Sequence, residues 1–231
     1  MKALITGANR GLGLEFVRQL TARGDQVFAT CRNPAEAAEL SHVQMQYPDR
    51  VSIIALDVTD PRSIAESHHQ VSTQTDTLDL LINNAGVNTN DGGFGTLDLE
   101  IMQSILTVNS IAPMLVTQQY LDLIRTGSQP KIVNISSGMG SLTNLNPIGH
   151  YSYSASKAGL NMYSLRLSHD LRNVGIIVII LDPGWVKTDM GGPNAYITPH
   201  DSINSMLQFI DCLTLNNSGG YYDYKGQTTP W

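Results

Sequence analysis

Short apolar runs rich in β-branched residues recur along the chain and alternate with longer stretches of mixed character. Their apolarity is continuous, which indicates strands covered on both faces, as in a parallel sheet between layers of helices. The pattern therefore predicts an α/β fold, a doubly wound parallel sheet with three layers, αβα. The predicted strands are Ala3–Thr6, Gln26–Thr30, Val51–Leu56, Leu78–Ile82, Lys131–Ile135 and Ile176–Leu181.

The stretches between these runs have helical character, and two of them carry recognisable ends. Asp60 stands at a capping position before Pro61, and Gly24 follows the first helix, where a C-terminal glycine belongs. No repeat, low-complexity tract or linker interrupts the sequence, which predicts one domain of residues 1–231. The predicted helices are Leu12–Arg23, Pro34–Tyr47, Pro61–Thr75, Asp98–Ile124, Ser152–Val174 and His200–Leu215.

Three irregular segments follow predicted strands, at Val87–Thr96, Gly138–His150 and Trp185–Pro199. Ligands of open parallel sheets bind beyond the carboxyl ends of the strands, so we expect a substrate pocket here, with the last segment as a glycine-hinged lid. The candidate pocket walls are Phe94, Met139, Leu142, Leu145, Ile148, Trp185, Met190 and Tyr196. Because these side chains are mostly apolar and include no paired cations, they favour a neutral, fairly apolar substrate.

Composition argues against several classes of function. With 14 Lys and Arg against 20 Asp and Glu, the formal net charge is -6 and no basic run exists, which disfavours nucleic-acid binding. The longest aliphatic run, Ile176–Leu181, is six residues, too short for a membrane helix. Two cysteines provide neither a disulfide framework nor a zinc site, and no cluster has metal-ligand spacing. We therefore expect a cytoplasmic protein without a metal.

The first predicted strand runs directly into a glycine-rich turn and then a helix. Glycines permit a sharp reversal and a close backbone approach to a pyrophosphate, while the helix N-terminus offers free N–H donors. The alternative is an ordinary strand–turn–helix connection with glycines for geometry alone, but the flanking strand and helix favour the phosphate-binding interpretation. The residues expected to contact a dinucleotide are Gly7, Asn9, Arg10, Gly11, Leu12 and Gly13.

The end of the second predicted strand indicates which dinucleotide binds. An acidic residue there holds the ribose hydroxyls of NAD, whereas a basic one accepts the 2′-phosphate of NADP. Arg32 follows that strand, and the nearby acid, Asp25, lies at its other end. Arg32 and Arg10 together favour NADP(H), the alternative being two solvated surface charges. After the third strand, Asp57–Val58 is either an adenine contact or a turn.

Tyr153 and Lys157 are four residues apart on a predicted helix and therefore share one face. The ordinary pKa of tyrosine is about 10, and an adjacent ammonium stabilises the phenolate, so the pair suits proton transfer at neutral pH. We predict that Tyr153 protonates a carbonyl oxygen during reduction. We interpret Tyr151 as a packing or rim residue. His150 precedes Tyr153 in a loop at the ligand edge of the sheet, but we do not expect it to take a direct part in the reaction.

Four motifs occur in register, namely Thr6-Gly7-x3-Gly11-x-Gly13, Asn83-Asn84-Ala85-Gly86, Tyr153-x3-Lys157 and Pro183-Gly184. In order and spacing they resemble the short-chain dehydrogenases/reductases over essentially the whole chain. Three further segments are similar to the sniffer-like and C-factor-like carbonyl reductases, namely Thr30–Asn33, Pro183–Gly192 and Gly219–Trp231. The resemblance implies a Rossmann fold and an NADP-dependent oxidoreductase.

The resemblance also implies roles for individual residues. It assigns the hydrogen bond to the substrate oxygen to Ser137, although the 16-residue spacing to Tyr153 is long for the family and leaves Ser136 and Ser141 as alternatives. It implies that Asn109, through an irregular backbone, orders a water in a proton relay with Lys157. It places the remaining cofactor contacts at Asn84, Ala85, Gly86, Pro183, Gly184, Val186 and Thr188, besides Tyr153 and Lys157.

These observations predict a reductase or alcohol dehydrogenase that transfers hydride between NADP(H) and a neutral aldehyde or ketone. The alternative from another class is an NADPH-binding sensor or signalling protein on the same fold. By resemblance, the helices Asp98–Ile124 and Ser152–Val174 are expected to pair two subunits into a homodimer. The alternative is that their apolar residues face only the sheet.

Overall fold

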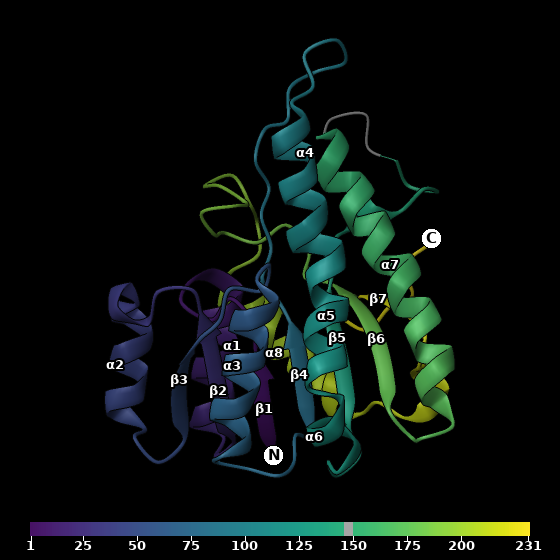
Figure 1. The fold of residues 1–231 in the computed structure, drawn as a ribbon. Helices are drawn as coiled ribbons and strands as arrows, with labels where there is room; N and C mark the ends of the chain where they lie inside the picture. The colour runs from purple at the N-terminus through teal and green to yellow at the C-terminus, as the bar shows by residue number, and fades with distance from the viewer. Residues whose placement is uncertain (146–149) are drawn as a thin grey trace.

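Seven parallel strands form the central sheet in a computed structural model that describes residues 1–145 and 150–231. The sheet order is β3-β2-β1-β4-β5-β6-β7, so the chain reverses its winding direction between β1 and β4 (Figure 1). The strands are β1 (Lys2–Ile5), β2 (Gln26–Cys31), β3 (Val51–Ala55), β4 (Leu80–Asn83), β5 (Lys131–Ile135), β6 (Ile177–Asp182) and β7 (Tyr221–Asp223). The six strands expected from the apolar runs are present, and the doubly wound α/β fold is confirmed.

Strand β7 was not expected from the sequence. It has three residues, follows Gly219-Gly220, and is recognisable only by its pairing with β6, in which Asp182 lies opposite Asp223. Tyr221 is fully buried at the start of this strand. A segment this short forms a strand because the exposed edge of β6 supplies its hydrogen-bond partners, not because of local propensity.

Helices cover both faces of the sheet (Figure 1). Helices α1, α2 and α8 share one hydrophobic core with the sheet, and α3, α5, α6 and the end of α7 share the other. The helix starts follow the expected chemistry, because Asp60 accepts a hydrogen bond from the Arg62 N–H, with Pro61 in the first turn. The helices are α1 (Gly11–Ala22), α2 (Ala38–Gln46), α3 (Pro61–Ser72), α4 (Leu99–Leu106), α5 (Ala112–Gln119), α6 (Leu121–Arg125), α7 (Tyr151–Arg172) and α8 (Pro199–Asp211).

The helix expected at Asp98–Ile124 is divided. A π-helical turn at Thr107–Ile111 separates α4 from α5, and the chain bends again at Tyr120 before α6. The expected helix Pro34–Tyr47 is similarly divided into a 3-10 turn, Pro34–Glu36, and α2. Single π turns within α-helices are often found at functional sites.

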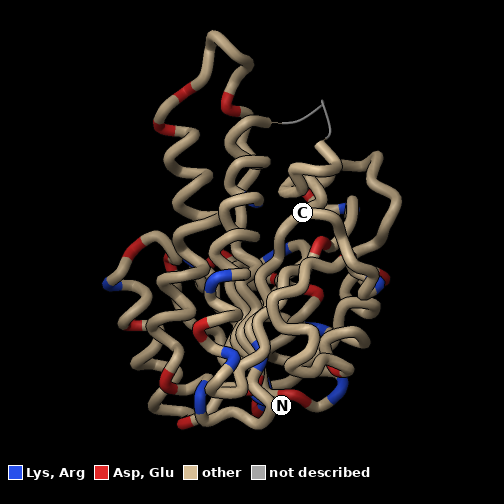
Figure 2. The backbone as a smooth tube through the Cα atoms, turned by 90° about the vertical axis from the view of Figure 1, so that its right-hand side faces the viewer, with Lys and Arg blue, Asp and Glu red and all other residues tan. Residues whose placement is uncertain are grey.

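A loop and two helix ends rise above the carboxyl edge of the sheet (Figure 1). The loop follows β4, leads into α4, and lies near the first turns of α7. Figure 2 shows acidic but no basic residues on this part of the chain, in agreement with its sequence between Val87 and Leu106. The projection therefore offers little positive charge to an anionic ligand.

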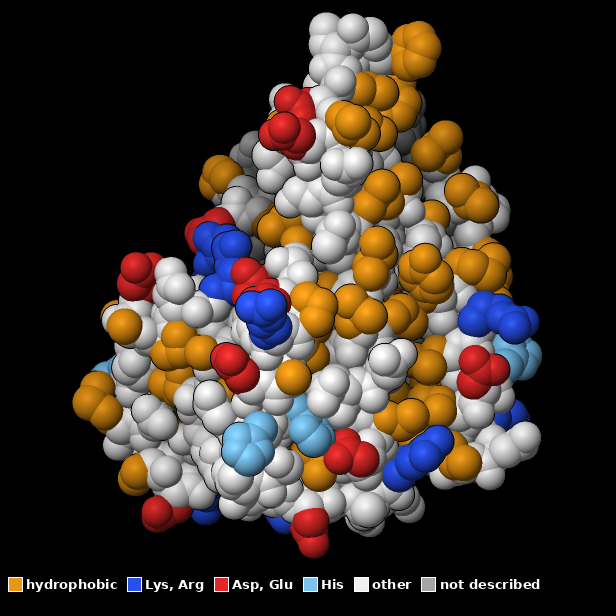
Figure 3. Space-filling model, viewed as in Figure 1, with side chains coloured by type: hydrophobic (Ala, Val, Ile, Leu, Met, Phe, Trp, Pro, Cys, Tyr) orange, Lys and Arg blue, Asp and Glu red, His pale blue; other side chains and the backbone are white. Residues whose placement is uncertain are grey.

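The segment Leu99–Gln119, which includes α4 and α5, is long and apolar enough to cross a membrane by length and composition, with a mean hydropathy of 1.4. Part of its apolarity belongs to the core, since Ile105, Ala112 and Val116 are buried. The rest is exposed, and Figure 3 shows apolar side chains along the outer face of α4, α5 and α7. The segment is thus an amphipathic layer of the αβα sandwich.

One polar contact within the core gives a test of this packing. The Tyr120 hydroxyl donates a hydrogen bond of 2.9 Å to Ser67 Oγ, and both side chains are fully buried. We predict that Tyr120→Phe lowers the free energy of unfolding by about 0.5–1.5 kcal/mol in a urea titration, because it removes the hydrogen bond without opening a large cavity. Tyr151→Phe on the exposed first turn of α7 is the matched control and changes little. Equal stabilities of both variants would contradict this packing.

Candidate active site

The glycine turn after β1 packs tightly against the turn after β4. A Cβ atom on Gly7, whose φ is +65°, would lie 2.9 Å from Ala85 Cα, and one on Gly13 would lie 2.2 Å from the Gly7 carbonyl oxygen. The Asn84 side chain donates hydrogen bonds to the carbonyls of Thr6 (2.9 Å) and Gly7 (3.1 Å). Only glycine leaves room for the two turns to lie this close together. Both turns follow the carboxyl ends of their strands.

The N-terminus of α1 faces a groove of about 460 Å³. Arg10, at the capping position, makes no side-chain cap, and no acidic residue stands in the first turn, so the first N–H groups and the positive end of the helix dipole are uncompensated. Asn9, Arg10, Gly11 and Thr188 line the groove, whereas Leu12 packs against the core. This arrangement has the chemistry of a phosphate site.

The two arginines expected beside a 2′-phosphate lie at this edge. Arg10 forms an exposed ion pair with Asp189 at 3.3 Å. Arg32, just after β2, lies near Asp57; burial raises the pKa of Asp57, but hydrogen bonds from Thr59 and the Arg32 charge outweigh it and leave that pKa below its ordinary value. Asp57 Oδ1 accepts from both the N–H (2.9 Å) and the hydroxyl (2.7 Å) of Thr59, which is the turn arrangement weighed above.

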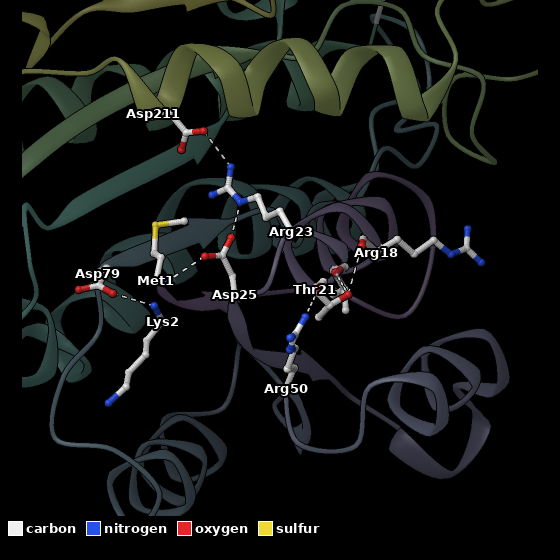
Figure 4. Close-up of polar contacts among 10 residues, drawn as sticks. Met1, Lys2, Arg18, Thr21, Arg23, Asp25, Arg50, Asp79 and Asp211 are labelled. Atoms are coloured by element: carbon white, nitrogen blue, oxygen red, sulfur yellow. Dashed lines mark hydrogen bonds and ion pairs between the residues drawn. The ribbon is translucent and has the colours of Figure 1, made fainter.

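Asp25 lies at the opposite edge of the sheet. Figure 4 shows its carboxylate between the amino group of Met1, 3.0 Å away, and the Arg23 guanidinium, which also pairs with Asp211. The sequence-based placement of Asp25 far from the nucleotide turn is therefore correct. Its burial is compensated by these two cations.

Four predicted catalytic side chains converge beyond β4, β5 and β6. Lys157 Nζ lies 5.7 Å from the centroid of the Tyr153 ring and donates to the Ile135 carbonyl at 2.8 Å. The Ser137 side chain lies beside Tyr153 and favours the phenolate form of that tyrosine. Gly86 joins the group to Asn109, since a Cβ on Gly86 would lie 3.4 Å from Asn109 Oδ1 and 3.8 Å from Lys157 Nζ.

The three candidate serines differ in their partners. The hydroxyl of Ser136 is buried and donates to Asn161 Oδ1 at 2.6 Å. The hydroxyl of Ser141 lies 3.2 Å from the Trp231 carbonyl, to which it donates. Ser137 lies beside Tyr153, and its Oγ accepts from the Met139 N–H at 3.2 Å, which leaves its hydroxyl proton without a partner among these contacts. The geometry therefore favours Ser137 as the substrate-facing serine.

Asn109 lies in the π turn, so the irregular backbone that the resemblance implies is present. Its side chain is fully engaged: Oδ1 accepts from the Val87 N–H (2.9 Å), while Nδ2 donates to the Val87 carbonyl (2.8 Å) and to Ser156 Oγ (3.0 Å). The amide thus ties the loop after β4 to α7. Any proton relay at this position must use the backbone of the turn rather than the amide.

Burial dominates the ionisation of the tyrosine–lysine pair. It raises the pKa of Tyr153 to about 12, an effect opposed by the hydrogen bond with Ser137 and reinforced by Asp182. Burial also lowers the pKa of Lys157 to about 8, against the opposing charge of Asp182. Lys157 is not among the causes of the shift in Tyr153, so burial sets that pKa here, and the expected tuning of Tyr153 by the ammonium stays a prediction.

The segment after β6 folds back on itself. Val186 pairs with Ile197, and the Trp185 indole N–H donates to the Gly191 carbonyl at 2.7 Å. Gly184 has a φ of +76°, and a Cβ there would lie 2.5 Å from the Ile197 side chain. The Pro183 carbonyl accepts from the hydroxyl of Ser202 in α8 at 2.7 Å. These contacts give the expected lid a defined conformation.

The candidate pocket walls are mostly exposed, and none of those that the structure describes lines the groove beside α1. Trp185 and Tyr196 form an edge-to-face pair with ring centroids 6.0 Å apart. The others with large exposed areas are Phe94, Leu142, Leu145 and Met190, whereas Met139 is half-buried. Ile148 lies outside the described residues. Among the residues that the structure describes, no group of three His, Cys, Asp or Glu side chains is arranged to hold a metal.

Sequence reasoning missed three residues around this group. Asp91 is buried and accepts from the Ser152 N–H at 2.6 Å, which holds the first turn of α7. Asp182 and Tyr221 both contact the turn that carries Ser137. Asp182 had a signal, an acidic residue at the carboxyl end of a buried strand, but Tyr221 had none because β7 itself was not expected. The His150 imidazole lies 2.9 Å from Asn88 Oδ1 and near enough to Asp91 to help lower the pKa of that carboxyl.

Comparison with known proteins shows what the chain is similar to. A family model described as short chain dehydrogenase matches residues 1–195. The C-signal protein of Myxococcus xanthus is 41% identical over 157 residues, which cover 68% of this chain and 95% of that protein. The crystal structure of NADPH-bound carbonyl reductase from chicken fatty liver is 37% identical, with a TM-score of 0.95 over 100% of this chain and 98% of that one. Carbonyl reductase Sniffer of D. melanogaster is 30% identical, with a TM-score of 0.95 over 100% and 99%.

The contact between the two turns makes a prediction for Gly13. We expect Gly13→Ala to lower the free energy of unfolding by about 1–3 kcal/mol in a urea titration, because its Cβ would meet the backbone of Gly7. The control is Gly93→Ala, since a Cβ on Gly93 meets no atom within 4 Å. A loss of stability in the control as large as that in Gly13→Ala would refute the close approach.

Proposed function

Because the chain belongs to the short-chain dehydrogenase family, we propose that it is an NADPH-dependent carbonyl reductase acting on a neutral, fairly apolar aldehyde or ketone. The chain is an oxidoreductase of CH–OH and C=O groups, and the same residues serve either direction of that reaction. The single observation that carries the proposal is the convergence of Ser137, Tyr153 and Lys157 beside the glycine turn.

The cradle around the glycine turn fits NADP(H). The close turn contacts, the uncapped α1 N-terminus and the exposed Arg10 and Arg32 suit a pyrophosphate and a 2′-phosphate. The similar carbonyl reductase from chicken fatty liver binds NADPH, which supports the same cofactor. We assign the pyrophosphate to Gly7, Asn9, Gly11, Leu12 and Gly13; the adenine to Asp57–Val58; the floor to Asn84, Ala85 and Gly86; and the nicotinamide to Pro183, Gly184, Val186 and Thr188. When bound, NADPH supplies the hydride.

The protein's own residues handle the proton. A Tyr153 with a pKa of about 12 keeps its hydroxyl protonated at neutral pH, so it can donate to a carbonyl oxygen as negative charge develops there. Ser137 offers a second hydrogen bond to the same oxygen. Lys157, with a pKa of about 8, stays mostly protonated below that pH and stabilises the phenolate left behind. With Tyr153 and Lys157 both protonated, the site is therefore in the state that suits carbonyl reduction.

The second candidate function is a signalling protein that binds NADPH on this fold. The similar protein from Myxococcus xanthus is named C-signal, which is the reason for considering this function. Turnover separates the two. Oxidation of NADPH, followed by absorbance over a panel of neutral aromatic aldehydes and ketones, supports the reductase. Binding of NADPH without turnover of any of these compounds supports the sensor instead.

Tyr153→Phe tests the proton donor. We expect reduction to fall by at least about 100-fold while NADPH affinity, measured by fluorescence titration, stays within a factor of a few, because only the hydroxyl is removed. Tyr151→Phe, on the exposed side of the first turn of α7, is the control and keeps its activity. Undiminished turnover of Tyr153→Phe would sink the assignment.

Arg32→Asp tests cofactor choice. The wild type should prefer NADPH to NADH in kcat/KM, and the variant should lose or reverse that preference, because a carboxylate repels the 2′-phosphate and accepts the ribose hydroxyls. Arg62→Asp, at the start of α3, is a control of equal charge change. A wild type that uses both cofactors equally would show that Arg32 is a surface charge.

The outer face of α4, α5 and α7 supports a homodimer. Exposed apolar residues there form a continuous strip that one two-fold axis can pair with its own copy (Figure 3). Residues of this strip are Leu99, Ile111, Leu115, Met162 and Tyr163. We also propose that residues 1–231 form one domain, because both hydrophobic cores pack on the same sheet. We propose a cytoplasmic location, because Cys31 and Cys212 are free thiols.

Light scattering tests the dimer. We expect a mass of twice 25.2 kDa for the wild type, and a monomer for the double variant Leu115→Glu, Met162→Glu, because two buried carboxylates oppose association. Met45→Glu changes an equally apolar, exposed residue on α2 and should leave the dimer intact. A monomeric wild type at micromolar concentration would overturn the proposal.

A further inference from the structure

Asp182, the last residue of β6, reaches the site but has no part in the reaction as described above. Its Oδ1 accepts a hydrogen bond from the Gly184 N–H at 3.0 Å, which closes the Pro183–Gly184 turn. Its other oxygen, Oδ2, faces Gly138: a Cβ there would lie 3.1 Å from it, and the Gly138 N–H favours the ionised carboxylate. One carboxylate therefore contacts both the turn assigned to the nicotinamide and the turn that carries Ser137.

The peptide group that follows Ser137 is held at both ends. Its carbonyl, on Ser137, accepts from the Tyr221 hydroxyl and from the Gly140 N–H at 2.8 Å. Its N–H, on Gly138, belongs to the residue that lies against Asp182 Oδ2. These contacts hold the turn that carries Ser137, and within that turn the Ser137 hydroxyl accepts from the Met139 N–H at 3.2 Å.

Asp182 also acts on the charges of the site. The titratable groups that face it are Tyr153 and Lys157 from α7 and Tyr221 and Asp223 from β7, while the turn 137–140 carries none. Burial and the nearby Asp223 charge raise the pKa of Asp182, while the N–H groups of Gly184 and Gly138 and the Lys157 ammonium favour its ionised form. When ionised, its negative charge opposes the phenolate of Tyr153 and stabilises the ammonium of Lys157. It therefore raises the pKa of both, and both groups keep their protons to higher pH.

We propose that Asp182 is a positioning residue for carbonyl reduction: its carboxylate holds the Ser137–Gly138 peptide against the Pro183–Gly184 turn and places a negative charge beside Tyr153 and Lys157. This inference rests on the reductase function proposed above. It separates Asp182 from an ordinary turn aspartate, whose role ends with its own backbone hydrogen bond.

Asp182→Asn is the discriminating substitution. Asparagine keeps the Oδ1 acceptor for Gly184, but its NH₂ group presents donors to the Gly138 N–H and carries no charge. We expect kcat for NADPH-dependent reduction of 4-nitrobenzaldehyde to fall about 10- to 100-fold at pH 7, with KM for NADPH little changed, because Ser137 is displaced. The basic limb of the pH profile, set by Lys157 near pH 8 in the wild type, should move to lower pH by about one unit.

Two further variants separate charge from position. Tyr221→Phe removes a donor to the Ser137 carbonyl without changing charge, so kcat should fall while the basic limb stays in place. Asp223→Asn is the matched control: it lies opposite Asp182 in the sheet, and its Oδ1 accepts from Lys225 (2.9 Å) and Gln227 (2.8 Å) in its own hairpin. Removing the Asp223 charge, which raises the pKa of Asp182, favours the ionised form of Asp182, so kcat and the basic limb should match the wild type.

A ¹³Cζ-tyrosine NMR titration provides a readout independent of turnover. The Tyr153 resonance, identified by its absence in Tyr153→Phe, should begin to titrate at lower pH in Asp182→Asn than in the wild type. If Asp182→Asn fails to fold, Asp182→Glu retains the charge, so its basic limb should match the wild type while its kcat falls.

Three outcomes would overturn the inference while the reductase function stands. The first is an Asp182→Asn variant with an unshifted basic limb and a kcat within a factor of two of the wild type. The others are an unshifted Tyr153 resonance in Asp182→Asn and full activity in Asp182→Glu. A wild type that reduces no carbonyl compound would instead overturn the proposed function, and the Tyr153 titration would still test the effect of the Asp182 charge.

Discussion

The close approach of the turn after β1 to the turn after β4 is the constraint on which the rest of the site depends. Gly7 leaves no room for a side chain against Ala85, and the Thr6 hydroxyl accepts from the N–H groups of Asn84 and Ala85 at 3.0 Å each. These contacts span the point where the winding of the sheet reverses. They leave the N-terminus of α1 open to the groove on the same edge as the tyrosine–lysine pair.

A chain of buried amides extends this constraint across the sheet. Asn83 in β4 donates to Asn134 in β5 at 2.8 Å, and Asn134 donates to Ser164 in α7 at 2.8 Å. Closer to the site, Ser136 donates to Asn161, also in α7. Polar groups buried this deeply require specific partners, so the network favours one register of α7 on the sheet. That register places Tyr153 and Lys157 beyond the strand ends.

The ionisation of the site follows from the same burial. Tyr153 and Lys157 lie where water is excluded, and both are driven toward their neutral forms, the phenol by a raised pKa and the amine by a lowered one. Asp182 opposes this for Lys157 and reinforces it for Tyr153. A neutral phenol beside a cationic lysine is the state that suits protonation of a carbonyl oxygen, so burial and the carboxylate act together.

The sequence by itself determined the elements whose signals are local. Continuous apolar runs predicted six strands of the sheet, the glycine pattern predicted the turn before α1, and the spacing of Tyr153 and Lys157 placed both on one helical face. Tertiary structure decided the rest. Strand β7 depends on the edge of β6, and the pKa of Tyr153 depends on its burial. The choice of Ser137 depends on partners distant in sequence, since Ser141 donates to the Trp231 carbonyl and Tyr221 holds the Ser137 carbonyl. The physical reason is that hydrogen-bond partners and desolvation are set by residues distant in sequence, whereas propensity and periodicity depend only on neighbours.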